Sequence, residues 1–181
     1  MHSQLVILDR DGVINKDSRE FVKSVDEWLP LPGSIEAIAA LSLAGFRVAV
    51  ASNQSGLARG LFSQEALDEM HQKLRGLVEH RGGRVDHIAI CPHGPDDGCD
   101  CRKPRPGLLH QVAAHFDLAL DDVPVIGDSL RDLQAAVAAG AQPILVRSGN
   151  GRMTEQELPA ELADIDVYDD LAAAATALLE R

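Results

Sequence analysis

Two carboxylates stand two positions apart near the start of the chain, directly after an apolar run. The run covers residues 5–8 and is followed by Asp9-Arg10-Asp11-Gly12. An unbroken apolar run is typical of a strand that is buried on both faces, as in a parallel sheet. Side chains at positions i and i+2 of an extended chain point the same way, so Asp9 and Asp11 can act on one substrate atom. The same four residues also fit a simple polar turn, so the rest of the chain must decide.

Polar groups follow later apolar runs as well, in the segments Ser52-Asn53-Gln54-Ser55-Gly56, Arg102-Lys103-Pro104 and Gly127-Asp128-Ser129. Ligands of parallel sheets bind at the carboxyl ends of the strands, and a carboxylate, a hydroxyl, a lysine and a distant acid suit phosphoryl transfer. We predict that Asp9 attacks phosphorus and that Ser52 and Lys103 hold its equatorial oxygens. Asp128 would help to bind Mg²⁺. Asp132 is either a support for that metal site or a solvated acid in a first helical turn, and is not counted as a ligand.

The three cysteines of the chain lie within eleven residues, together with a histidine. Cys91, His93, Cys99 and Cys101 form the pattern Cys-x-His, five residues, Cys-x-Cys. Three thiolates and an imidazole make a closed tetrahedral set that suits structural Zn²⁺. The alternative is a group of small buried thiols beside a surface histidine. We predict zinc, which would fold the loop 91–101 and take no part in the chemistry.

Alternating strand and helix patterns must position these groups. Strands are predicted at 5–8, 46–51, 87–90, 123–126 and 144–146, with a short one near Val167. Amphipathic stripes predict helices between Gly33 and Gly45, from an N-cap at Ser63 to 78, at 106–116, from 130 to a stop at Gly140, and at 171–179. Residues 148–159 are expected to be a polar surface segment with a capping box at Thr154 and Glu157. The order predicts a single α/β domain over 1–181, with a doubly wound, mainly parallel sheet, helices on both faces and no large cap domain.

Composition and charge restrict the class of partner. With 181 residues and 45% hydrophobic content, the chain can bury a core, and its net charge of −11 disfavours nucleic acid and anionic membrane surfaces. A small phosphate can still bind where basic groups, backbone amides or a metal supply positive charge. No signal peptide and no membrane-spanning run is evident. We therefore expect a cytoplasmic protein, monomeric, whose partner is a small molecule.

The four strand-end segments, in their order, resemble the haloacid dehalogenase superfamily of phosphatases. The matching residues are Asp9-Arg10-Asp11-Gly12, Ser52-Asn53, Lys103 and Gly127-Asp128. The resemblance implies that Asp9 forms an aspartyl-phosphate, while Asp11 protonates the leaving alcohol and then deprotonates the attacking water. It also implies that Mg²⁺ is held by Asp9, the backbone carbonyl of Asp11 and Asp128.

The zinc loop before Arg102 narrows the resemblance to a branch that contains heptose-bisphosphate and histidinol-phosphate phosphatases. Segments 53–60 and 101–107 are more similar to the heptose group. The resemblance implies Mg²⁺-dependent removal of the C7 phosphate of a sugar bisphosphate; the alternatives are histidinol phosphate, or an inactive zinc-stabilised binding module. Some heptose phosphatases carry lysine where this chain has Ser129, and Arg131 could replace that contact. The implied substrate contacts are Asp17, Ser18, Arg19, Glu20, Ser52, Asn53, Gln54, Ser55, Arg102 and Lys103.

Overall fold

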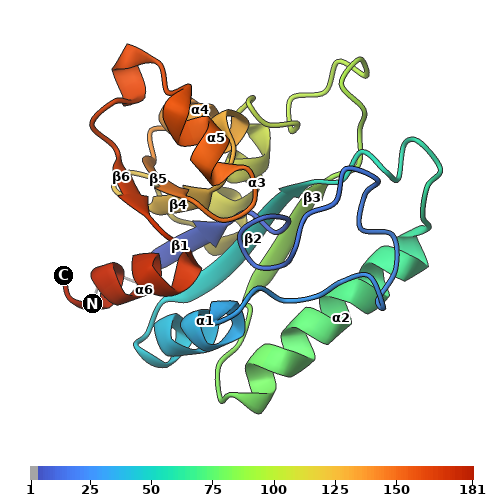
Figure 1. Ribbon diagram of the computed structural model, residues 1–181, viewed down its shortest axis with the longest axis horizontal. Coiled ribbons are helices and arrows are strands. Elements are labelled where there is room, and N and C mark those ends of the chain that lie inside the picture. Colours follow the sequence, from blue (N-terminus) through green and yellow to red (C-terminus); the bar gives the residue numbers. More distant parts are fainter. Residues whose placement is uncertain (1–3) are drawn as a thin grey trace.

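A six-stranded parallel sheet forms the centre of the computed structural model, which describes residues 4–181 (Figure 1). The strand order is β3-β2-β1-β4-β5-β6, so the chain winds outward in both directions from β1. This confirms the predicted doubly wound parallel sheet. The strands are β1 (Leu5–Leu8), β2 (Arg47–Asn53), β3 (His87–Cys91), β4 (Pro124–Gly127), β5 (Gln142–Val146) and β6 (Asp166–Tyr168).

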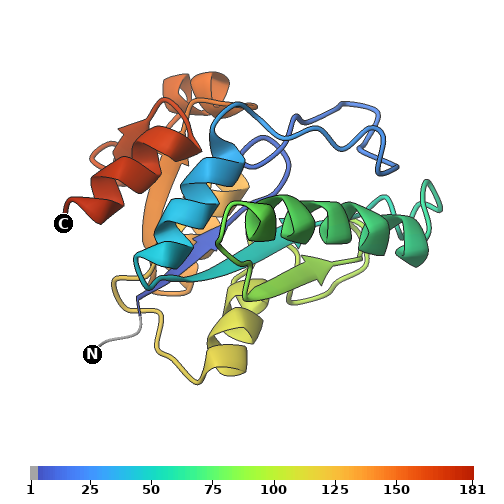
Figure 2. The same ribbon diagram turned by 90° about the horizontal axis from the view of Figure 1, so that it is seen from below.

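Helices cover both faces of this sheet (Figure 2). One face packs against α1, α2 and α6, and the other against α3 and α4. The two apolar layers explain why β1 is apolar throughout: Val6 and Leu8 belong to one layer, and Leu5 and Ile7 to the other. The helices are α1 (Ser34–Leu43), α2 (Gln64–His80), α3 (Gly107–Phe116), α4 (Leu130–Ala138), α5 (Gly151–Gln156) and α6 (Leu171–Leu179), with a 3₁₀ turn at Ala160–Leu162.

Loops at the carboxyl ends of the strands take the place of a separate cap. Residues 9–33 connect β1 to α1, residues 54–63 connect β2 to α2, and residues 92–106 connect β3 to α3. Figure 1 shows these connections extending beyond the same end of the sheet. Within residues 4–181, none of the helices combines the length and apolarity needed to cross a membrane.

The segment that follows β5 departs from the sequence prediction. It contains the helix α5, and Thr154 lies inside this helix and does not cap its start. The predicted capping box at Thr154 and Glu157 is therefore wrong. The Thr154 hydroxyl donates to the carbonyl oxygen of Asp128 at 2.8 Å. A six-residue helix is too short to show a clear apolar period, and it is fixed by this tertiary contact.

Candidate active site

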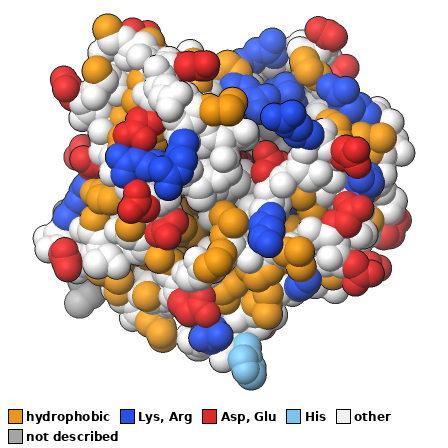
Figure 3. Space-filling model, viewed as in Figure 1, with side chains coloured by type: hydrophobic (Ala, Val, Ile, Leu, Met, Phe, Trp, Pro, Cys, Tyr) orange, Lys and Arg blue, Asp and Glu red, His pale blue; other side chains and the backbone are white. Residues whose placement is uncertain are grey.

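A cavity of about 300 Å³ lies at the carboxyl ends of the strands and gathers most of the predicted site residues. These come from the end of β2 and from the segments that directly follow β1, β2, β3 and β4. Lysine and arginine side chains gather in the upper right of the space-filling view (Figure 3). The predicted residues that line the cavity are Asp9, Asp11, Asp17, Ser18, Ser52, Asn53, Gln54, Ser55, Arg102, Lys103 and Asp128.

Lys103 lies at the bottom of the cavity, where it joins two carboxylates. Its Nζ donates to Asp9 Oδ1 at 3.0 Å, to Asp132 Oδ1 at 2.7 Å and to the carbonyl oxygen of Ala51 at 2.8 Å. Burial alone would lower the pKa of Lys103, but Asp132 and Asp9 raise it, so the ammonium stays charged. Asn53 fixes the backbone of this lysine, because its side chain accepts from Lys103 N and donates to Lys103 O.

Asp132 is nearly fully buried and connects the lysine to the end of β4. Its Oδ2 accepts from Asp128 N at 3.2 Å and from Ser129 N and Oγ at 3.1 and 2.9 Å, which forms a capping box at the start of α4. Burial acts to raise the pKa of Asp132, but the Lys103 ammonium lowers it below its usual value. Of the two alternatives that the sequence left open, the supporting role is the one that the structure favours.

Asp128 lies in a narrow cradle between two glycines. A Cβ on Gly12 or on Gly149 would overlap the Asp128 carboxylate, and both glycines have positive φ, 88° and 57°. Asn150 donates its backbone N–H to Asp128 Oδ2 at 2.8 Å. Burial, followed by the charge of Asp132, raises the pKa of Asp128 to about 7. Asn150 is a site residue that sequence reasoning missed, since the segment carried no recognised motif.

The Asp11 carboxylate faces a different set of donors. Arg10 donates to both of its oxygens, Asn15 Nδ2 donates to Oδ1 at 2.8 Å, and Gln54 Nε2 donates to Oδ2 at 2.9 Å. Gln54 also donates to Ser52 Oγ at 2.8 Å. The Gln54 amide, predicted to contact the substrate, thus donates to two predicted catalytic residues, Asp11 and Ser52.

Three carboxylates in the cavity could hold a metal ion. Ligand oxygens of Asp9, Asp128 and Asp132 lie within 4.8 Å of one another. Burial, followed by the charge of Asp132, raises the pKa of Asp9 well above its usual value although the Lys103 ammonium acts to lower it, and a bound cation would favour the ionised carboxylate. Both oxygens of Asp132 accept hydrogen bonds, whereas Asp9 accepts through Oδ1 and Asp128 through Oδ2, so Asp9 and Asp128 are the carboxylates best suited to an oxygen-binding cation such as Mg²⁺.

The cysteine loop forms a second candidate metal centre. The ligand atoms of Cys91, His93, Cys99 and Cys101 all lie within 4.8 Å of one another, with the sulfurs of Cys91 and Cys99 3.7 Å apart. Sulfurs around a tetrahedral zinc with bonds near 2.3 Å would lie roughly 3.8 Å apart, a distance that the Cys91–Cys99 pair matches. The sulfurs of Cys91 and Cys101 are 3.1 Å apart and would have to separate on binding, and the donor set itself suits zinc. Burial, and then the neighbouring cysteines, raise the pKa of the Cys101 thiol to about 12.

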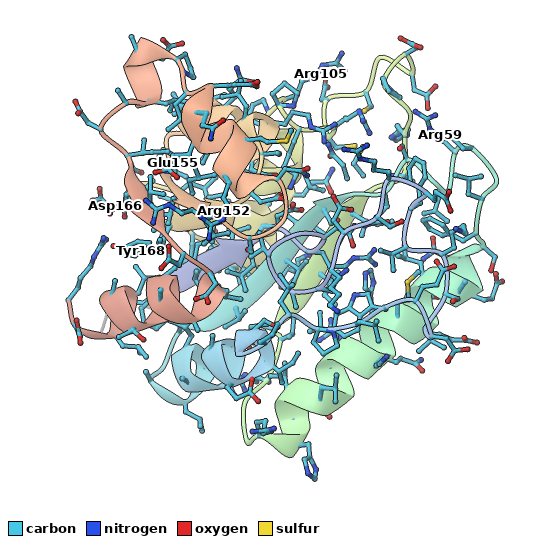
Figure 4. All side chains as sticks on the ribbon, viewed as in Figure 1. Arg59, Arg105, Arg152, Glu155, Asp166 and Tyr168 are labelled. Atoms are coloured by element: carbon cyan, nitrogen blue, oxygen red, sulfur yellow. The ribbon has the colours of Figure 1, made fainter. Side chains whose placement is uncertain are left out.

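The remaining predicted contacts divide between the cavity and its surroundings. Asp17 and Ser18 line the cavity, whereas Arg19 and Glu20 line neighbouring hollows outside it. Three further lining residues add charge or a ring to the rim: Phe21, Arg59 and Arg131. Arg59 packs over the Phe21 ring at 5.5 Å. In Figure 4, Arg59 and Arg105 lie far from Glu155 and Asp166, which are near α5 and β6.

Comparisons with known proteins agree with this geometry. A family model described as HAD-hydrolase-like matches residues 100–174, and one described as polynucleotide kinase 3 phosphatase matches residues 4–135. A D-glycero-β-D-manno-heptose-1,7-bisphosphate 7-phosphatase from Pseudomonas putida is 54% identical, covering 97% of this chain and 99% of the relative. One from Pseudomonas aeruginosa is also 54% identical, covering 99% and 100%.

A crystal structure shows the same likeness in three dimensions. The D,D-heptose 1,7-bisphosphate phosphatase from B. bronchiseptica, complexed with magnesium and phosphate, superposes with a TM-score of 0.94 at 54% identity, covering 98% of each chain. The fold and the cavity thus define a phosphatase of the haloacid dehalogenase type. At this level of identity over nearly the whole length, the chain belongs to the D-glycero-β-D-manno-heptose-1,7-bisphosphate 7-phosphatase family.

Proposed function

We propose that this enzyme hydrolyses the C7 phosphate of D-glycero-β-D-manno-heptose 1,7-bisphosphate. The observation that carries the proposal is the placement of Asp9, Lys103 and Asp128 at the bottom of a cavity whose rim carries several arginines. The relatives at 54% identity bear the name of this activity. The B. bronchiseptica relative was crystallised with magnesium and phosphate, which suits the carboxylate pair of Asp9 and Asp128.

In the proposed reaction, Asp9 is the nucleophile. Its carboxylate oxygen forms a bond to phosphorus as the bond to the sugar oxygen breaks, which gives an aspartyl-phosphate. Lys103 holds Asp9 at 3.0 Å and would stabilise the equatorial oxygens together with Ser52. Mg²⁺, held by Asp9, the Asp11 backbone carbonyl and Asp128, would neutralise charge on the transferred group.

Asp11 serves as the general acid and base. It would protonate the leaving sugar oxygen and later take a proton from the water that hydrolyses the aspartyl-phosphate. Its contacts with Arg10, Asn15 and Gln54 fix the carboxylate between the β1 loop and the β2 loop. A general acid and base must keep its position through both half-reactions, and these contacts hold the Asp11 carboxylate in place.

The arginines at the rim support a substrate with a second phosphate. Arg102 lies close enough to Arg131 and Arg59 that, after burial, their charges lower its pKa. Repulsion between cations is costly unless an anion binds among them, and one phosphoryl group is already served by Lys103. Histidinol phosphate instead carries an amine, which these arginines would repel. A polynucleotide is disfavoured by the net charge of −11.

We also propose that Zn²⁺ binds Cys91, His93, Cys99 and Cys101 as a structural ion. The proposal is supported by the gathering of three thiols and one imidazole within 4.8 Å of one another, with the Cys91 and Cys99 sulfurs at a separation that suits a tetrahedral centre. The metal would fold a loop that continues directly into Arg102 and Lys103. Arg102 Nη1 donates to the backbone oxygen of His93 at 3.3 Å, so the loop and the cavity are mechanically connected.

A comparison of kcat/KM tests the proposed substrate. We expect the heptose bisphosphate to be preferred clearly over histidinol phosphate and over an oligonucleotide with a 3′-phosphate, and Asp9→Asn to reduce turnover to near background. Arg102→Ala should lower kcat/KM for the bisphosphate by about ten- to a hundredfold, as for a lost charged hydrogen bond, and affect a monophosphate less. Equal or better activity on histidinol phosphate would overturn the substrate assignment and leave the mechanism intact.

A further inference from the structure

Arg10 is a fully buried cation whose guanidinium connects the candidate general acid to a helix far along the chain. Its Nε and Nη2 donate to Asp11 Oδ1 at 3.1 and 2.9 Å, and Nη2 also reaches Oδ2 at 3.1 Å. Its other terminal nitrogen, Nη1, lies 3.3 Å from Nε2 of His71, which belongs to α2 and is 61 positions away in sequence. The planar guanidinium is thus held on two sides.

His71 is suited to accept a hydrogen bond from Arg10. An imidazole can accept only through an unprotonated nitrogen. Burial, followed by the charge of Arg10, lowers the pKa of His71 to about 4, so the ring is neutral near pH 7. With Nε2 as the acceptor, the ring proton lies on Nδ1. His71 does not line the cavity, and its hydrogen bond to Arg10 is what connects it to the Asp11 carboxylate.

We propose that His71 is a positioning residue for the proton transfer, acting through Arg10 to hold the Asp11 carboxylate against the leaving group. The inference rests on the phosphatase chemistry proposed for Asp9 and Asp11, and not on the choice of heptose as substrate. Without an acceptor at position 71, the Nη1 side of the buried guanidinium loses its partner. The fork that fixes both Asp11 oxygens can then turn.

The donors around Asp11 also indicate which oxygen carries the proton. Oδ1 accepts from Arg10 Nε, Arg10 Nη2 and Asn15, whereas Oδ2 accepts from Gln54 and shares Arg10 Nη2. Oδ1 accepts from three donors and Oδ2 from two, one of which is shared, so we assign proton transfer to Oδ2, the less occupied oxygen. When the Asp9–phosphorus bond forms and the phosphorus–sugar oxygen bond breaks, the Oδ2 proton moves to the sugar oxygen. In the second half, water bonds to phosphorus, the Asp9–phosphorus bond breaks, and a water proton returns to Oδ2.

Leaving-group dependence separates positioning from a general structural effect. An alkoxide needs a proton in order to leave, whereas nitrophenolate leaves without one. The quantity to measure is kcat/KM, because it includes only the steps up to release of the alcohol and is unaffected by hydrolysis of the aspartyl-phosphate. The two substrates are the heptose bisphosphate and p-nitrophenyl phosphate. Turnover of either substrate by the wild type tests the proposed phosphatase activity. The ratio of the two kcat/KM values in each variant tests the positioning role of His71.

Three variants of His71 and one neighbour form the set. His71→Leu removes the acceptor, His71→Asn offers an amide that is too short to reach, and His71→Gln restores an acceptor near the original place. Gln72→Leu makes the same new residue at an exposed position of the same turn. Urea unfolding checks that each variant is folded, and His71→Asn carries the test should His71→Leu fail to fold.

We expect His71→Leu and His71→Asn to lower kcat/KM about tenfold for the bisphosphate and less than twofold for p-nitrophenyl phosphate, a fraction of the ~10²–10⁴ that a general acid can contribute. His71→Gln should recover most of the loss, and Gln72→Leu should change neither substrate. An equal fall for both substrates, or no fall for either, would overturn the inference. A wild type that cleaves neither ester would refute the proposed function instead.

Discussion

Replacing Asp132 by asparagine tests whether this buried carboxylate holds the site together. Its Oδ1 accepts from Lys103 and its Oδ2 accepts from Ser129 and from Asp128 N. An asparagine of the same shape has one oxygen acceptor and one NH₂ donor. It must therefore turn its NH₂ group either toward the Lys103 ammonium or toward the donors of Ser129 and Asp128 at the start of α4. Each lost bond to a charged group or buried donor costs about 1–3 kcal/mol. Weaker repulsion of Asp9 and Asp128 offsets part of this cost.

The net loss of unfolding free energy for Asp132→Asn is expected to be about 3 kcal/mol, as for a broken buried ion pair. For a chain of this length it corresponds to a fall in Tm of roughly 6–12 °C. The assay is urea unfolding at pH 7 in magnesium-free buffer, with kcat measured in parallel after magnesium is added. Asp164→Asn, at an exposed position, is the matched control. A loss below about 1 kcal/mol would show that the described contacts do not stabilise the site.

Three further predictions address the metal loop, the buried histidine and the glycine cradle. Metal analysis of protein purified without chelators should find one zinc per chain in the wild type and none in Cys99→Ser, and the activity of this variant should fall. A wild type without zinc would refute the proposed zinc site. His71 stays neutral in the folded state down to a pKa of about 4 but takes up a proton near 6.5 once unfolded. Wild type should therefore lose about 2 kcal/mol more than His71→Gln between pH 7 and pH 5, measured by urea unfolding; equal losses contradict it. Gly140 has positive φ and open space around it, so Gly140→Ala should lower the unfolding free energy by about 1 kcal/mol and leave activity unchanged. Gly12 has positive φ and a Cβ there would also overlap Asp128, so Gly12→Ala should lower both the unfolding free energy and the activity by more than Gly140→Ala does.

The sequence predicted the parts of the site that depend on strand ends. Asp9, Ser52 and Asp128 each follow an apolar run, and parallel strands bring such ends to one edge of a sheet. The helix stop at Gly140 was also visible, because a residue with positive φ just after a helix favours glycine. These features depend on local pattern and on a topology rule, so they needed no knowledge of the packing.

Other parts of the site depend on packing between distant segments. Asn150 reaches Asp128 only because the chain after β5 folds back over the sheet edge, and His71 meets Arg10 only because α2 lies against the β1 loop. Neither residue belongs to a recognisable motif. The two readings of Asp132 could not be separated for the same reason, since a first-turn acid and a buried partner of Lys103 have the same sequence pattern.

The charge distribution explains how a protein with a net charge of −11 can bind an anion. At the bottom of the cavity, Asp9, Asp128 and Asp132 lie around the Lys103 ammonium, and burial followed by the charge of Asp132 raises the pKa values of Asp9 and Asp128. A phosphate would be repelled there without a cation beside these carboxylates. The rim has the opposite balance, because Arg59, Arg102 and Arg131 line it, and burial followed by the charges of Arg131 and Arg59 lowers the pKa of Arg102. A substrate with one phosphate at the carboxylates and another at the rim is the ligand that relieves both imbalances, provided that a divalent cation accompanies the first.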